Sequence, residues 1–225
     1  MNEAQLIVTL ALLGGVLSLD VTAAFQVMLS QPIAAGGIAG LVAGDPVTGV
    51  AVGGALQLVW IGVVPVGAAP FPDGAVASTV GVGVAVLMGR AGATSGIGVT
   101  SGLVAGLLVG AVSQLLTARV RRWNVRLADM AERGAARGDA GSVSRAVGLA
   151  LLMRMATSTA LCAAALALAL LLRPASVIEV RGGFPPFLWA GAIAAGAMLA
   201  SRKGRWLAYC VVGGFAVGVL LAGVA

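Results

Sequence analysis

The sequence has no histidine, only two cysteines, and charged residues at just 10% of its positions. With no histidine, no glycine-rich phosphate-binding loop and no cysteine in a polar setting, no side chain can be assigned to phosphoryl transfer. Cys162 and Cys210 both lie in apolar runs. Cysteines in such runs are expected to pack as small residues rather than to form a disulfide or a ligand pair. The sequence predicts no cofactor and no metal site.

The shortage of charge also predicts a membrane protein. Hydrophobic residues make up 60% of the chain, and the mean hydropathy is +1.05. Runs without any charge lie at 91–118, 155–172, 182–201 and 206–225. So few polar residues cannot coat a soluble globule, which argues against a soluble enzyme. The net charge of +6 is confined to a few connecting segments, as in loops outside a bilayer, and nucleic acid is not an expected partner.

The first residues and one proline-rich stretch refine the fold class. Met1-Asn2-Glu3 lacks the basic residues of a secretory signal, so residues 4–19 are expected to be a retained membrane segment. Residues 44–78 carry no charge between Asp45 and Asp73 but are interrupted by Pro65, Pro70 and Pro72. In hydrocarbon, a segment that cannot stay helical is tolerated only where it is buried or lines a watery cavity. We therefore predict an all-α polytopic membrane protein, with short re-entrant or broken helices between about residues 32 and 90.

A polar residue precedes each of three expected helices in this region. Ser30 is expected to cap a helix that begins at the proline two residues later. Asp45 is expected to cap residues 46–64 and Asp73 to cap residues 74–88. Discontinuous helices whose ends point into the membrane are a recurring way to build a polar site at mid-depth. The region around Asp73 is therefore a candidate site.

The apolar segment 5–29 is interrupted by Gly14, Gly15, Asp20, Thr22 and Gln26. A carboxylate inside a membrane costs about 2.5–3.5 kcal/mol at a helix centre, so it usually faces a bundle interior or a cavity. The alternative is that Asp20 caps a helix end near the interface. Both interpretations stay open from the sequence.

Gln57 is the only strongly polar side chain of the expected helix 46–64. Gly53 lies one turn before it and Trp60 about one turn after it, so the three project to similar sides. An amide, the free space at a glycine and an indole face together suit a sugar. Alternatively, Gln57 bonds to a neighbouring helix and Trp60 anchors at the membrane interface.

Glycines spaced four apart form two strips. One consists of Gly36, Gly40 and Gly44, and the other of Gly98, Gly102, Gly106 and Gly110. Residues at this spacing share a helix face, so the strips predict close helix packing, and they favour association into an oligomer.

Residues 117–146 form the one long polar segment. It contains seven arginines against three acidic residues, so the positive-inside rule places it in the cytoplasm. A second basic cluster at 202–205 agrees, because two expected spans, 147–172 and 186–201, separate the clusters. The spacing of Trp123 and its apolar neighbours predicts either an amphipathic helix on the bilayer surface or a solvated basic loop. Such a face would receive anionic lipid or a soluble partner.

The stretch 44–73 resembles the membrane subunit IIC of the mannose-type phosphotransferase system, the sugar permease component. The matching motifs are a Gly-Asp turn, a Gly-Gly pair before a Gln, a Gly-x-x-Pro-x-Gly-Ala and a Pro-Asp. They occupy Gly44, Asp45, Gly53, Gly54, Gln57, Gly62, Pro65, Gly67, Ala68, Pro72 and Asp73. Asp20 and Ser30-Gln31-Pro32-Ile33 are similar to further family elements. The family often has Arg where this chain has Gln31, and a carboxylate where it has Gln57.

The resemblance implies a carrier that binds an external hexose-type sugar and moves it across the bacterial inner membrane. Phosphorylation would then fall to a cytosolic IIB subunit, supplied by IIA, and a IID-type membrane subunit would be the partner in the bilayer. The expected substrate-binding residues are Asp73, Gln57, Asp20, Trp60, Asp45 and Gln26. The chain would then divide into a membrane region with the broken-helix site at 1–116, the basic cytoplasmic segment at 117–146 and C-terminal spans at 147–225.

Two functions of other classes remain open from the sequence. One is a transporter of another small solute that works without phosphate. The other is a membrane sensor or scaffold that transports nothing and binds partners through its arginine-rich segment.

Overall fold

The computed structural model describes residues 1–21, 23–24, 26–61 and 71–172. Within these ranges the regular structure is helical throughout. The elements in order are α1 (Glu3–Leu17), the 3-10 helix η1 (Ser18–Val21), α2 (Pro32–Ala43), α3 (Pro46–Trp60), α4 (Gly74–Arg90), α5 (Ser95–Ala135) and α6 (Gly141–Leu172). Several predicted features lie outside the described residues. They are the expected spans at 186–201 and 206–225, Cys210, and the prolines at 65 and 70.

Within the described residues, three helical segments are long and apolar enough to cross a membrane, namely Glu3–Val21, Ser95–Ala135 and Gly141–Leu172. Between the first and second of these lie α2, α3 and α4, with 12, 15 and 17 residues. At 1.5 Å per residue the longest of the three covers about 26 Å, short of the roughly 30 Å hydrocarbon core. The predicted series of short helices between residues 32 and 90 is confirmed, although α3 ends at Trp60 and not near residue 64.

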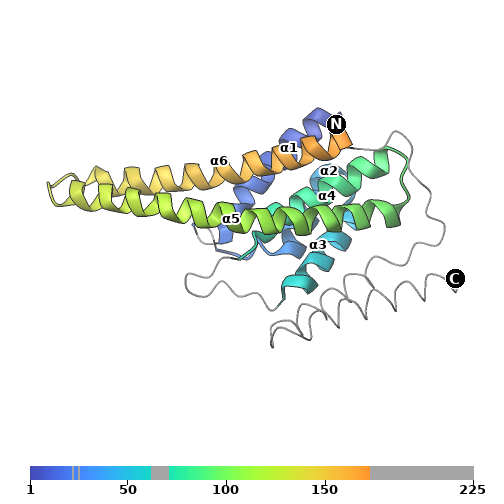
Figure 1. Ribbon diagram of the computed structural model, residues 1–225, viewed down its shortest axis with the longest axis horizontal. Helices are drawn as coiled ribbons and strands as arrows, with labels where there is room; N and C mark the ends of the chain where they lie inside the picture. The colour runs from blue at the N-terminus through green and yellow to red at the C-terminus, as the bar shows by residue number, and fades with distance from the viewer. Residues whose placement is uncertain (22, 25, 62–70, 173–225) are drawn as a thin grey trace.

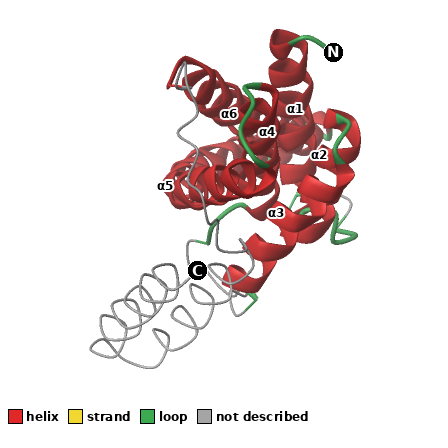
Figure 2. Cartoon of the chain, turned by 90° about the vertical axis from the view of Figure 1, so that its right-hand side faces the viewer, coloured by secondary structure: helices red, strands yellow, loops and turns green. Residues whose placement is uncertain are grey.

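Helix α4 forms the centre of the bundle. Every residue from Ala75 to Leu87 is buried, and α4 packs against α1, α2, α3, α5 and α6. The end-on view shows these helices gathered around it (Figure 2). Cys162 of α6 is fully buried and lies so close to Gly14 of α1 that a β-carbon there would be 2.6 Å from its Sγ. It packs as a small residue, as predicted.

The glycine strips bring helix backbones together. A β-carbon on Gly36 would lie 2.7 Å from the carbonyl oxygen of Gly49, so α2 and α3 touch along their backbones. On α5, β-carbons added to Gly98 and Gly106 would lie 3.0 and 2.9 Å from carbonyl oxygens of α4. Gly44 is different, because it ends α2 in the left-handed conformation with φ of 83° and so is not part of a packing strip.

Helices α5 and α6 form a long hairpin that extends well beyond the other helices (Figure 1). With 41 residues, α5 is about 60 Å long, roughly twice the hydrocarbon thickness. The arginine-rich segment 117–146 is therefore neither a loop nor a separate surface helix: it is the end of α5, a short turn and the start of α6. At the tip a hollow of about 560 Å³ lies among Met130, Arg133, Gly134, Arg137, Asp139, Ser142, Arg145 and Leu149.

Candidate functional site

Asp73 is the N-cap of α4 and is almost completely buried, with 1% of its surface exposed. Its Oδ1 accepts hydrogen bonds from the backbone N–H groups of Ala75 and Val76, at 3.1 and 3.2 Å. Backbone N–H groups in the first turn of a helix have no partner within the helix, and a side chain that accepts from them caps it. The predicted cap is therefore confirmed. The backbone N–H of Asp73 in turn donates to Ser113 Oγ of α5 at 2.8 Å.

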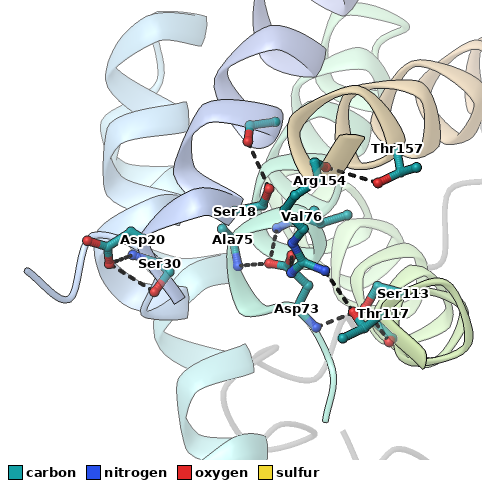
Figure 3. Close-up of polar contacts among 12 residues, drawn as sticks. Ser18, Asp20, Ser30, Asp73, Ala75, Val76, Ser113, Thr117, Arg154 and Thr157 are labelled. Carbon is teal, nitrogen blue, oxygen red and sulfur yellow. Dashed lines mark hydrogen bonds and ion pairs between the residues drawn. The ribbon is translucent and has the colours of Figure 1, made fainter. Parts of the chain in front are cut away.

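The second oxygen of Asp73 lies against an arginine that sequence reasoning missed. Arg154 Nη2 donates to Asp73 Oδ2 at 2.5 Å, and its Nη1 donates to Thr117 Oγ1 at 2.9 Å. Figure 3 shows the guanidinium of α6 between the start of α4 and the side of α5. Arg154 is the only charge in the expected span 147–172, and an intramembrane charge is a functional candidate by default. That signal could have found it.

Gln57 bonds to the residue that precedes α2. Its Nε2 donates to Gln31 Oε1 at 3.1 Å, which is the predicted alternative of a bond to a neighbouring helix. Its own Oε1 is buried and has no hydrogen-bond partner within the described ranges. A buried acceptor without a partner costs about 1–3 kcal/mol. The described residues therefore leave this amide oxygen as an unsatisfied acceptor.

Trp60 and Pro32 connect Gln57 with Asp73. The Trp60 ring lies on Gly110 of α5, where a β-carbon would be 2.7 Å from the ring and 3.5 Å from Pro72. Pro32 contacts α3 at Gly53 through its carbonyl and lies 3.0 Å from where a β-carbon on Gly74 would be. The start of α2 therefore contacts both α3 and the start of α4.

Asp20 shapes the chain between η1 and α2. It is buried, with 3% of its surface exposed, and its carboxylate accepts hydrogen bonds from the Val27 and Ser30 backbone N–H groups at 2.7 and 2.9 Å. The Ser30 hydroxyl also donates to it at 3.0 Å (Figure 3). The prediction that Ser30 caps α2 is wrong, because its side chain is engaged by Asp20. The N-cap position is held by Gln31, without a side-chain cap bond.

Asp45 and Gln26 lie away from this meeting point. Asp45 caps α3 by accepting from the Thr48 N–H at 3.0 Å, as predicted. Because α2 has 12 residues, the α2–α3 turn that holds Asp45 is about 18 Å from Pro32. Gln26 is exposed on the loop before α2, with φ of 55°. The structure thus groups Gln57, Trp60 and Asp73, with Asp20 bracing the adjoining loop, and leaves the other two candidates outside the group.

The arrangement offers amide and carboxylate acceptors, an indole face and the N-terminal ends of α2 and α4. No group of three or more carboxylates or cysteines in the described part of the chain could hold a metal ion. A hydroxyl-rich ligand fits these groups better than an ion or a purely apolar molecule.

Comparison with known proteins identifies the family of the chain. The family model described as the phosphotransferase system (PTS) sorbose-specific IIC component matches residues 2–201. The chain belongs to this family. This IIC-family chain is 37% identical over 105 residues to the sorbose-specific EIIC component of Lacticaseibacillus casei, covering 47% of the chain and 35% of that relative. It is 32% identical over 114 residues to the mannose-specific EIIC component of Escherichia coli K12, covering 51% of the chain and 40% of that relative.

Solved structures support the same fold. A structure described as a membrane protein covers 96% of the IIC-family chain with a TM-score of 0.64 and 20% identity, and the match spans 86% of that structure's chain. The cryo-EM structure of the mannose transporter ManYZ with microcin E492 covers 97% of the chain and 78% of its own, with a TM-score of 0.57 and 23% identity. The chain is therefore an integral membrane protein with the fold of these proteins. Its matched stretches span well under half of the two EIIC relatives.

Proposed function

We propose that this chain is the IIC sugar permease subunit of a phosphoenolpyruvate-dependent phosphotransferase system, and that it binds a hexose-type sugar where α2, α3 and α4 meet. The observation that carries this proposal is the buried Gln57 Oε1, which has no partner within the described ranges and lies one helical turn from the Trp60 indole. A sugar presents hydroxyl donors beside an apolar ring face, and those two features match an amide oxygen and an indole.

Each grouped residue has a distinct proposed role. Gln57 Oε1 accepts a hydrogen bond from a sugar hydroxyl, and the Trp60 ring packs against the apolar face of the sugar. Asp73 provides a second, charged acceptor. Asp20 contributes indirectly, by holding the loop that leads into α2. Asp45 and Gln26 are assigned no contact with the sugar, because they lie at the α2–α3 turn and on an exposed loop.

The partners follow from family membership. We assign phosphorylation of the sugar to a cytosolic IIB subunit, supplied by IIA, and expect a IID-type subunit beside this chain in the bacterial inner membrane. An oligomer surrounded by lipid stays part of the proposal, but the glycine strips do not support it, because they are used for contacts within the chain. The chain itself acts as carrier and not as the kinase.

The test measures sugar binding and uptake by the chain co-expressed with IID-type and IIB-type subunits. A panel of radiolabelled hexoses and amino sugars identifies the ligand. Gln57→Met keeps the size of the side chain but removes the acceptor, and we expect affinity to fall by about tenfold. The matched control is Gln5→Met at the exposed start of α1. Unchanged binding by the Gln57 variant, or accumulation of unmodified sugar without phosphoenolpyruvate, would contradict the proposal.

A further inference from the structure

Arg154 is a buried charge in the middle of a helix long and apolar enough to span the membrane. The residue is 9% exposed. Its Nη1 and Nη2 atoms bond to Thr117 and Asp73, whereas its buried Nε has no partner in the described part of the chain. Hydrophobic residues of similar volume often replace buried ion pairs without loss of stability. Stability alone therefore does not account for a charge at this position.

The hydrogen bonds of Asp73 leave room for one more donor. A carboxylate has about four lone-pair positions. Within the described residues three are taken, by the Ala75 and Val76 N–H groups on Oδ1 and by Arg154 on Oδ2. The guanidinium compensates the carboxylate charge and fixes its plane. One acceptor position on Oδ2 then has a defined direction at the start of α4.

We propose that Arg154 is a positioning residue for the sugar: it holds Asp73 charged and oriented so that the remaining Oδ2 lone pair accepts a sugar hydroxyl. This inference rests on the proposed function. Arg154 acts through Asp73 and needs no contact with the sugar itself. Because Thr117 of α5 holds the same guanidinium, the position of Asp73 is set by the α5–α6 hairpin as well as by α4.

The experiment separates positioning from a structural role by neutralising one or both members of the pair. The single variants Arg154→Gln and Asp73→Asn each leave one buried charge without its partner, so we expect a lower melting temperature and lost sugar binding. The double variant Arg154→Gln/Asp73→Asn buries no charge, and we expect its melting temperature to recover while sugar binding stays lost. Arg145→Gln/Asp139→Asn removes the exposed ion pair at the hairpin tip and is the matched control, expected to leave both measurements unchanged.

A conservative variant gives an independent measurement. Arg154→Lys keeps the charge but loses the planar fork that fixes the carboxylate, so the protein should fold while its sugar affinity falls by about tenfold. A double neutral variant that regains sugar binding along with stability would overturn the inference, and so would wild-type affinity in Arg154→Lys. Absence of sugar binding by the wild-type complex would overturn the proposed function, and the inference with it.

Discussion

The amide of Gln57 at the end of α3 donates to the amide of Gln31 at the start of α2, over 3.1 Å. These are the two positions at which the sequence departs from the family pattern it resembles, with Gln in place of an arginine and of a carboxylate. The two departures therefore contact each other. Together they leave a neutral amide pair where opposite charges could have paired.

This contact predicts coupling between the two positions. Gln57→Glu alone puts a half-buried carboxylate beside an amide, and we expect it to lower the free energy of unfolding by about 1–3 kcal/mol. Gln31→Arg added to it should recover at least part of the loss, because the arginine pairs with the carboxylate. Thermal unfolding of the two single variants and the double variant measures the coupling. Purely additive effects would show that the side chains do not interact.

The contact between α2 and α3 predicts a strict size limit at Gly36. A β-carbon there would lie 2.7 Å from both the Gly49 carbonyl oxygen and the Gly53 Cα, and backbone cannot turn away as a side chain can. Gly36→Ala should therefore cost about 1–3 kcal/mol of unfolding free energy and weaken sugar binding by moving Gln31 from Gln57.

The control for Gly36 is Gly148 in α6, which has nothing within 4 Å of its added β-carbon. Gly148→Ala should leave stability unchanged or raise it by up to about 1 kcal/mol, because alanine favours helix more than glycine does. Thermal unfolding in the same detergent compares the pair. Equal stability of the two variants would refute close contact between α2 and α3.

The two capping aspartates should behave differently. Asp45→Ala removes a cap at the α2–α3 turn and should cost about 1 kcal/mol, with sugar affinity unchanged. Asp73→Ala also leaves Arg154 buried without a partner. We therefore expect it to lower the free energy of unfolding by about 3–5 kcal/mol and to abolish sugar binding. Melting temperature and binding are measured on the same preparations. If Asp45→Ala lost sugar binding at full stability, Asp45 would be a sugar-binding residue after all.

The turn of the α5–α6 hairpin should be reachable from the cytoplasm only. Ser144 is exposed near the tip, so Ser144→Cys, in a chain with Cys162 and Cys210 replaced by alanine, should react with a membrane-impermeant maleimide. We expect labelling in inside-out vesicles and none in right-side-out vesicles. The reverse pattern would contradict the orientation drawn from the arginines.

Local signals carried the sequence predictions that are confirmed. Asp45 and Asp73 cap helices that begin one residue later, and glycines four apart lie on helix contacts. The missed contacts are long-range: Arg154 and Asp73 are 81 residues apart, and no periodicity joins them. Ser30 is a residue type that often caps helices, but its hydroxyl instead donates to Asp20, ten residues away. The segment from residue 117 was expected to be a loop or a separate surface helix because it is charged, but charge does not end a helix without a helix breaker.

The α5–α6 hairpin connects the arginines at its tip with the Arg154–Asp73 contact. Arg154 lies thirteen residues from the start of α6 at Gly141, or about 20 Å along a continuous helix. Thr117 sits at a similar depth on α5. Two continuous helices therefore connect the arginines at the tip with the residues that hold Asp73. No loop interrupts either helix between the tip and these contacts, so we expect the tip and the Asp73 carboxylate to move as one rigid unit.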